Sequence, residues 1–410
     1  MSLHKLTAGS GYEYLTRQVA AQDATEKGYS GLASYYTERG ETPGMWVGSG
    51  CADVGEGFLH STVTAEQMQA LFGAGMNPVG PETLRQLGPD APKEAAAEAM
   101  RLGAPYRLTG TVDEFRIEVA RRIEELNKSR GLRRDAPVSV DDRARIRTAV
   151  AREVFVREFG REPRDARELA GTIARHSRPA ATAVAGFDLT FSPPKSVSTV
   201  WAVADPTTAA RIEVAHQKAV AEALKFIESN LLYSREGARG VRQVDVTGLV
   251  AAAFTHRDSR AGDPDLHTHV AVANKVKTVG SGKWLSIDAR VLYRGVVAAS
   301  ETYNTALTKL LEREGLRFTD RASRSGRRPV REIAGVAAEL NERWSSRRTD
   351  IEVRRADLVA AFQADHGRPP SVVESVKLAQ QATLETRDAK HEPRSLAQQR
   401  AVWHRQAVET

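Results

Sequence analysis

The sequence predicts an α+β protein: a mainly antiparallel central sheet flanked by helices, with an inserted helical subdomain and a helical C-terminal part. Between residues 181 and 292, several stretches alternate polar and apolar residues and are separated by hairpin-length turns. Residues 81–180 are rich in Ala, Arg and Glu at helical spacing, and helical spacing returns from residue 293. Strands joined by short turns pair antiparallel. We expect the helices between them to pack on the resulting sheet and cover it.

Composition sets the broad class. The chain has 410 residues, of which 41% are hydrophobic and 27% charged, as in soluble globular proteins with two or three domains. It has no apolar run of about 18 residues and no N-terminal secretory signal, so no membrane insertion is expected. The single cysteine, Cys51, fits a reducing compartment, which predicts a cytoplasmic location.

The net charge of +7 suits a polyanionic partner. Arginines gather in three stretches, at 121–135, 321–332 and 345–357. These stretches could grip a nucleic acid, or they could be solvated helix faces and loops.

The first 80 residues are expected to form the N-terminal part of the core. "LHKLTAGSG" predicts a strand that ends in a glycine turn, and "YEYLTRQVAAQ" predicts a helix that begins there. Residues 63–75 predict a short helix with Thr64 as its N-cap and Gly73 or Gly75 at its end.

The segment 81–180 is expected to be the helical insertion, and strand signals return after it. "AGFDLTFSPPKSVST" alternates three apolar residues with Asp188, Thr190 and Ser192, and two prolines end the strand because they cannot donate to the ladder. A helix, "TTAARIEVAHQKAVAEALKFIESN", follows. Three further strand candidates occupy residues 240–256, 267–278 and 283–288, and "VGSGKW" is the hairpin turn between the last two.

Three histidines form the main chemical motif. In "HTHVAVAN", the period of two places His267 and His269 on one face, beside small alanines that leave room for an ion. His256 ends the preceding apolar run, and "RDSRAGDPDL" can turn the chain back. Three neutral imidazoles from adjacent strands, with coordination positions left open, are typical of a catalytic divalent metal. Alternatively, His256 caps a strand and the pair faces solvent.

An acidic residue and four tyrosines complete the candidate site. Asp188 could accept the second N–H of a metal-bound imidazole, or act as a base; its alternative role is an ion pair with Lys195. The tyrosines form two pairs, Tyr12 with Tyr14 and Tyr35 with Tyr36. A tyrosine hydroxyl, with an ordinary pKa of about 10, needs a cation or carboxylate to become a nucleophile.

These motifs, in this order, resemble the TraI/TrwC-type (MobF) conjugative relaxases of the His-hydrophobic-His single-strand endonuclease group. The resemblance runs from about Leu3 to the end and rests on the tyrosine pair, "FDLTFSPPKSVS" and "HRDSR…DPDLHTHVAVANKV". It implies that His256, His267 and His269 are metal ligands. It also implies that Asp188 orients a ligand or assists the tyrosine.

The resemblance places the nucleophile in the first tyrosine pair. That pair is usually two adjacent tyrosines, whereas here it is split as "YEY". Tyr14 lines up best with the nucleophile, and Tyr12 remains a competitor, because on a helix the two point about 200° apart. Tyr35 would stand for the tyrosine that some members use in a later transfer step, with Tyr36 close behind.

The activity that the resemblance implies is metal-dependent, strand-specific nicking of origin-of-transfer DNA. The products are a 5′-phosphotyrosine and a free 3′-OH, and the step can be reversed. Mg²⁺ or Mn²⁺ is expected in function, with Zn²⁺ or Ni²⁺ possible in a crystal. The implied partners of a monomer in the bacterial cytoplasm are single-stranded and hairpin DNA, relaxosome accessory proteins, a coupling protein and a type IV secretion machinery.

On this basis the chain is expected to divide into four parts. Residues 1–80 carry the tyrosines, 81–180 form an insertion of unassigned role, 181–292 hold the metal site, and 293–410 clamp DNA. Such relaxases usually continue into a helicase, so the sequence is interpreted as a relaxase domain. Three alternatives stay open: a rolling-circle initiator or transposase with the same chemistry, a hydrolase that uses metal-bound water, and a non-catalytic DNA-binding module.

Overall fold

The computed structural model describes residues 1–13, 15, 44–106, 114–133, 136, 138–177, 183–259, 261–321, 329–386 and 395–410. The chain forms two compact units. Unit 2 is Arg107–Ala183, and unit 1 comprises Met1–Tyr106 with Val184–Thr410. Each unit is described by itself.

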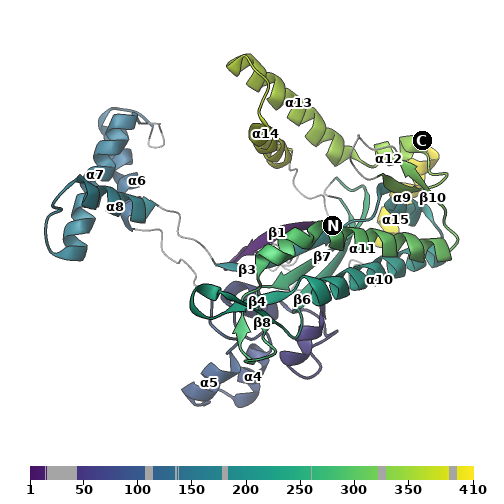
Figure 1. Ribbon diagram of the computed structural model, residues 1–410. Coiled ribbons are helices and arrows are strands. Elements are labelled where there is room, and N and C mark those ends of the chain that lie inside the picture. The colour runs from purple at the N-terminus through teal and green to yellow at the C-terminus, as the bar shows by residue number, and fades with distance from the viewer. Residues whose placement is uncertain are drawn as a thin grey trace. The chain divides into compact units, whose positions relative to one another are not determined.

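A five-stranded antiparallel sheet is the centre of unit 1 (Figure 1). Its spatial order is β1 (Ser2–Thr7), β3 (Val184–Phe191), β7 (Pro264–Ala273), β6 (Ala251–Asp258) and β2 (Met45–Val47). The two edge strands therefore come from the start of the chain, and the three inner strands come from much later. This sheet, with its covering helices, confirms the predicted α+β class.

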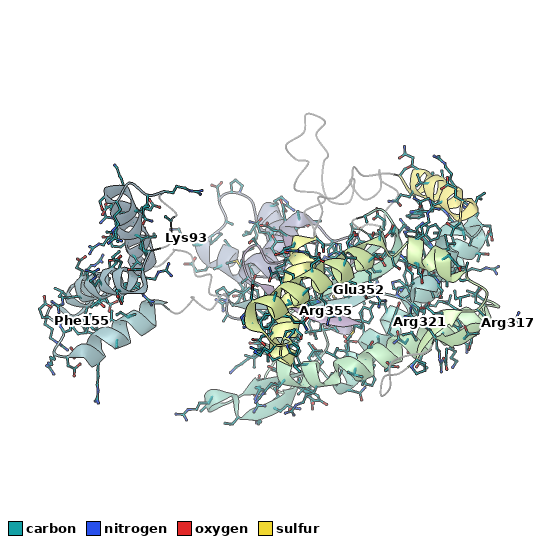
Figure 2. The ribbon with its side chains drawn as sticks, turned by 90° about the horizontal axis from the view of Figure 1, so that it is seen from above. Lys93, Phe155, Arg317, Arg321, Glu352 and Arg355 are labelled. Atoms are coloured by element: carbon teal, nitrogen blue, oxygen red, sulfur yellow. The ribbon has the colours of Figure 1, made fainter. Side chains whose placement is uncertain are left out.

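Unit 2 consists of three helices in the described part of the chain, α6 (Glu114–Ser129), α7 (Val140–Phe159) and α8 (Ala166–Ser177). Phe115, Val150, Ala151 and Val154 form its small core, and Phe155 beside it is also buried (Figure 2). The sequence placed the insertion at 81–180. The compact unit instead begins at Arg107, because α4 (Gly80–Leu87) and α5 (Lys93–Ala99) belong with unit 1.

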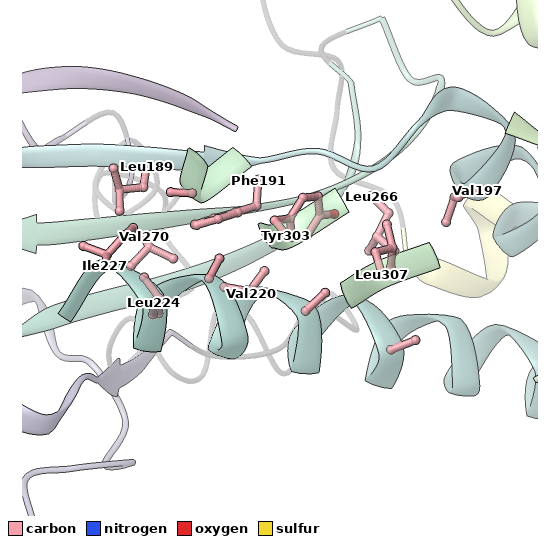
Figure 3. Close-up of a cluster of buried hydrophobic side chains, with 14 of the residues drawn as sticks. Leu189, Phe191, Val197, Val220, Leu224, Ile227, Leu266, Val270, Tyr303 and Leu307 are labelled. Atoms are coloured by element: carbon pink, nitrogen blue, oxygen red, sulfur yellow. The ribbon is translucent and has the colours of Figure 1, made fainter. Parts of the chain in front are cut away.

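The main hydrophobic core lies between the sheet and a layer of long helices (Figure 3). This layer contains α9 (Lys195–Val203), α10 (Pro206–Asn230) and α11 (Ala289–Arg313). Apolar residues recur along α10 at helical spacing, from Ala209 and Ile212 to Leu224 and Ile227, so one side of the helix is buried. They meet the alternate side chains of β3 and β7, such as Leu189 and Val270.

The opposite face of the sheet is covered by the N-terminal segment. Thr64 is the N-cap of α3 (Ala65–Met68), as predicted, and it forms a capping box with Gln67. A π-helical turn, η2 (Gln69–Ala74), continues to Gly75, whose left-handed backbone ends it. The ring of Phe72 in η2 lies so close to Gly186 of β3 that a Cβ there would be 3.0 Å from it. This contact fixes η2 against the sheet.

Short strands and C-terminal helices complete unit 1. The run 240–256, predicted as one strand, is divided between β5 (Arg242–Asp245), which pairs with β4 (Tyr233–Glu236), and β6. Residues 276–285 form the predicted hairpin, β8 (Val276–Lys277) with β9 (Trp284–Leu285). The C-terminal part also contains a hairpin that the sequence did not predict, formed by β10 (Phe318–Arg321) and β11 (Val330–Ile333). The remaining elements are η1 (Ser49–Asp53), η3 (Ala238–Gly240), α12 (Ala338–Arg343), α13 (Ser346–His366), α14 (Val372–Glu385) and α15 (Leu396–Val408).

In the part of the chain that the structure describes, none of the helices combines the length and the apolar character that a bilayer crossing requires.

Candidate metal centre and active site

The three histidines meet on the face of the sheet opposite the long helices. His256 of β6 stands directly across from His267 of β7, and His269 follows two residues later on the same side. The ring centres of the three imidazoles lie 5.2 to 5.6 Å apart. The turn between β6 and β7 therefore brings together the residues that the spacing singled out.

Neighbouring acceptors fix the proton on two of the rings. The Nδ1 of His269 lies 2.9 and 3.0 Å from the carboxylate oxygens of Asp188, and the Nδ1 of His267 lies 2.7 Å from the carbonyl of Asp265. Because a carboxylate and a carbonyl can only accept, each Nδ1 carries the hydrogen and each Nε2 presents a lone pair. Burial also lowers the pKa of His267, which favours the neutral imidazole that a metal requires.

The ring positions fit one divalent ion. A ligating imidazole nitrogen lies about 2.0–2.1 Å from its metal, so three rings around one ion have centres roughly 5 Å apart. Among the described residues, no group of three His, Cys, Asp or Glu side chains is arranged to hold a metal ion as it stands. The 5.2 to 5.6 Å between the ring centres is therefore the observation that singles out these three rings as candidate ligands.

Asp188 is held where it can orient His269. It is 2% exposed, and it lies across from the small Ala271 of β7, two residue pairs away from the Thr190–His269 pair. The Thr190 hydroxyl also lies 3.2 Å from the His269 Nδ1. Lys195, the alternative partner considered for Asp188, donates instead to the carbonyl of Pro264 at 2.6 Å.

Of the candidate tyrosines, only Tyr12 can be placed. It is 8% exposed, its ring centre lies 6.3 Å from that of Phe72, and burial raises its pKa. Since Phe72 rests on Gly186, two residues before Asp188 on the same face, the start of the tyrosine segment lies on the face that carries the histidines. Tyr14, Tyr35 and Tyr36 lie outside the described residues.

One residue at this face was missed in the sequence. His4 of β1 is exposed and stands directly across from Asp188 of β3, so the two side chains share the histidine face. The only local signal was its place in the alternating strand "LHKL". Its importance depends on a pairing with residue 188, which local sequence does not reveal.

Comparison with known proteins supplies the family. A profile of the TrwC relaxase family matches residues 8–410. Two relatives are each named multifunctional conjugation protein TraI. The one from Escherichia coli is 43% identical over 104 residues, which is 25% of this chain and 6% of the relative. The one from Escherichia coli strain K12 is 36% identical over 138 residues, which is 32% of this chain and 8% of the relative. The alignments thus span less than a tenth of either relative.

Two solved structures show the same fold. One is described as the conjugative relaxase TrwC in complex with oriT DNA; it covers 100% of this chain and 97% of its own, with a TM-score of 0.55 and 21% identity. Another complex, described as metal-bound, has the same coverage and identity with a TM-score of 0.52. Because the family profile extends over nearly the whole chain, the protein belongs to the TrwC relaxase family.

Proposed function

We propose that this chain is a conjugative DNA relaxase domain that nicks single-stranded origin-of-transfer DNA by tyrosine transesterification. The observation that carries the proposal is the set of three imidazoles on one sheet face, with the His269 ring held by the buried Asp188 carboxylate. The start of the tyrosine segment covers that same face, through the contact of Tyr12 with Phe72. Family membership and this geometry point to the same chemistry.

His256, His267 and His269 would hold the divalent ion, with Mg²⁺ or Mn²⁺ as the expected metal. When bound, the ion supplies positive charge to a scissile phosphate. Asp188 keeps the proton of His269 on Nδ1, which aims Nε2 toward the ion. His4, across from Asp188, is placed to meet a DNA phosphate at the same face.

Tyr14 is the proposed nucleophile, since the Tyr12 ring is packed into the core and burial raises its pKa. The phenolic oxygen bonds to phosphorus, the phenolic proton leaves to a base, and the P–O3′ bond breaks. The departing 3′ oxygen takes up a proton. One phosphodiester replaces another, so the reaction can run backwards and rejoin the strand. Tyr35, or its neighbour Tyr36, would serve a later transfer step.

The ion pairs of the arginines favour unit 1 over unit 2 as the part of the chain that binds DNA. In unit 2, Arg121, Arg122 and Arg130 pair with acidic neighbours, such as Asp142 at 2.8 Å from Arg130. These arginines form solvated helix faces. Arg355 of α13 in unit 1 is exposed and is better placed to meet a phosphate, whereas Arg321 of β10 lies 3.6 Å from the Glu332 carboxylate (Figure 2). Single-stranded and hairpin origin DNA is the proposed ligand, and its affinity should fall steeply with salt.

The proposed setting is the bacterial cytoplasm, where the domain acts as a monomer. Relaxosome accessory proteins, a coupling protein and a type IV secretion machinery would be its protein partners. These proposals follow from family membership.

The deciding experiment is a denaturing gel of a single-stranded oligonucleotide that carries the cognate origin, incubated with Mn²⁺. Wild type should form a covalent protein–DNA adduct, and EDTA should abolish it. Tyr14→Phe should lose the adduct, whereas the matched control Tyr12→Phe should keep it. Loss in Tyr12→Phe alone would assign the nucleophile to Tyr12. Cleavage without an adduct, unaffected by either substitution, would contradict the relaxase mechanism and favour a metal-bound water as nucleophile.

A further inference from the structure

The strands that carry the histidines have a second set of polar residues on their rear face, buried under the helices. Thr268 lies between His267 and His269 in β7 and points the opposite way, into the core, where it is 3% exposed. Its hydroxyl lies 2.8 Å from the Nε2 of His216 in α10 and 2.9 Å from the hydroxyl of Thr255 in β6. A hydroxyl in this position joins the two ligand-bearing strands to one helix.

The polar chain continues through the helix layer. His216 is fully buried, and its Nδ1 lies 2.8 Å from the hydroxyl of Tyr303 in α11. Burial lowers the pKa of His216 to about 3 and raises that of Tyr303, so both groups are neutral at physiological pH. A neutral imidazole has one donor and one acceptor nitrogen, and here each nitrogen has a partner.

A second anchor lies behind His256. The next residue, Arg257, is 7% exposed and points to the rear face, where its guanidinium meets the Glu213 carboxylate at 3.0 and 3.2 Å. The indole N–H of Trp201 also donates to Glu213, at 2.9 Å. Glu213 and His216 are three residues apart on α10 and therefore share one side of that helix.

These contacts determine which way the histidines face. The side chains of a strand alternate, so a slip of β7 by one residue would turn His267 and His269 into the core and Thr268 out of it. Leu266 and Val270, which flank Thr268 on the rear face, are fully buried and already oppose such a slip. Thr268 has directional partners there, and a buried hydroxyl without a partner is costly.

We propose that His216 and Thr268 are positioning residues for the metal centre, and that α10 sets the spacing of all three imidazoles from behind the sheet. This inference rests on the proposed metal site and deepens it. The buried chain Tyr303–His216–Thr268–Thr255 fixes the H-x-H strand, and Glu213–Arg257 fixes the neighbouring His256.

The test measures Mn²⁺ affinity by calorimetry, with the melting temperature as a second readout. Thr268→Val keeps the shape but removes the hydroxyl, and it should weaken Mn²⁺ binding by roughly 10- to 100-fold, the usual effect of losing a residue that supports a ligand. Thr268→Ser restores the hydroxyl and should restore the affinity. Ile227→Val, a core substitution at the far end of α10, should lower the melting temperature and leave Mn²⁺ affinity unchanged.

The outcomes separate this inference from the proposed function. If wild type fails to bind Mn²⁺, or His267→Ala binds as tightly as wild type, the metal site itself is wrong and the inference falls with it. If wild type binds and Thr268→Val binds equally well while melting earlier, the polar chain is merely structural and only the inference is overturned. Mn²⁺ binding that weakens in Thr268→Val and returns in Thr268→Ser supports it.

Discussion

At the residue scale, the candidate site depends on which atom of each imidazole carries the proton. The carboxylate of Asp188 and the carbonyl of Asp265 can only accept, and they select the same tautomer for His269 and His267. The His267 contact is with the main chain two residues earlier, so it is built into the strand itself. A substitution at Asp188 therefore removes orientation from one ligand and leaves the other unchanged.

His216 should make the stability of unit 1 sensitive to acid. Its pKa falls from an ordinary 6.5 in the unfolded chain to about 3 in the folded chain, because burial disfavours the charged ring. The unfolded chain then binds more protons between these two values. The contribution of His216 is thus complete above about pH 6.5 and is lost as the pH falls toward 3, by about 1.4 kcal/mol per pH unit.

Denaturant unfolding at several pH values, followed by tryptophan fluorescence, checks this prediction. All five tryptophans lie in unit 1, so the signal reports that unit alone. His216→Gln, which keeps a donor and an acceptor but does not titrate, should lose less stability than wild type between pH 6.5 and pH 4. Equal losses in the two proteins would contradict the assignment.

Much of the site follows from sequence at this scale, and its limits are physical. The period of a strand is two, so the shared face of His267 and His269 was predictable. The pairing of His256 with His267 followed from the turn between them. His4 was missed because its neighbour is Asp188, in a strand that is far away in the sequence. Tyr12 and Tyr14 could not be told apart by spacing, since that choice depends on what each ring packs against.

At the scale of elements, the connection between His256 and His267 is held by C-terminal helices. Asp258 accepts from Gln399 of α15 at 3.0 Å, the Gly262 carbonyl accepts from the Trp403 indole of α15 at 2.9 Å, and Asp263 accepts from the Ser346 hydroxyl of α13 at 2.6 Å. Helix α9 holds the other side, where Lys195 donates to Pro264 and the Ser198 hydroxyl accepts from the amide of Leu266. The hydroxyl-rich "PPKSVS" motif therefore fixes the start of the H-x-H strand.

Trp403→Phe should loosen this connection. The ring remains in the core beside Trp201, but the Gly262 carbonyl loses its donor, at a net cost of about 1 kcal/mol. Hydrogen–deuterium exchange of peptides spanning residues 256–267 should become faster. Trp344→Phe is a matched control, because its equally buried indole donates to Gln406 at 2.8 Å rather than to the connection. Faster exchange at 256–267 in the control as well would show that the effect is general destabilisation.

The elements that the sequence missed share one cause. The apolar run 240–256 has no obvious break, yet β5 ends at Asp245 and β6 begins at Ala251. The chain passes Ser49 between them so closely that a Cβ on Gly248 would lie 1.9 Å from the Ser49 hydroxyl. The hairpin of β10 with β11 likewise depends on Ser196 of α9, whose hydroxyl accepts a hydrogen bond from the amide of Ile333. Tertiary contacts decide both cases, and local patterns do not contain them.

At the scale of the whole molecule, unit 2 is attached through two neighbouring points of unit 1. Tyr106 is the last residue before unit 2, and its hydroxyl donates to the carbonyl of Ala185, just after the chain returns, at 2.8 Å. Lys275 holds the same place, donating to the carbonyls of Leu102 and Ala104. The proposed ligands and Asp188 all belong to unit 1.

Replacing residues 107–183 with a six-residue Gly/Ser linker should therefore preserve the metal site. The linker must join Tyr106 to Val184, two points about one tyrosine side chain apart, since the Tyr106 hydroxyl reaches the Ala185 carbonyl. Six residues span up to about 20 Å, which is more than this gap. Mn²⁺ affinity should match that of wild type. The salt dependence of single-strand binding should also be retained, because Arg121, Arg122 and Arg130 are engaged with acids. If DNA affinity of the shortened protein falls less steeply with salt than that of wild type, unit 2 makes a share of the DNA contacts. If Mn²⁺ binding is lost, the metal site depends on unit 2, which would contradict this prediction.

The strand order has a consequence for how the protein is made. The edge strand β1 is complete at Thr7, but β3, the strand that pairs with it among the described residues, begins at Val184. At about 5–20 residues per second, a ribosome needs roughly 10–35 s to synthesise what lies between them. The helices of unit 2 make local contacts and can form during that interval, whereas β1 and β2 wait without their partners. Translation speed and chaperone access during this interval should therefore influence the yield of active protein.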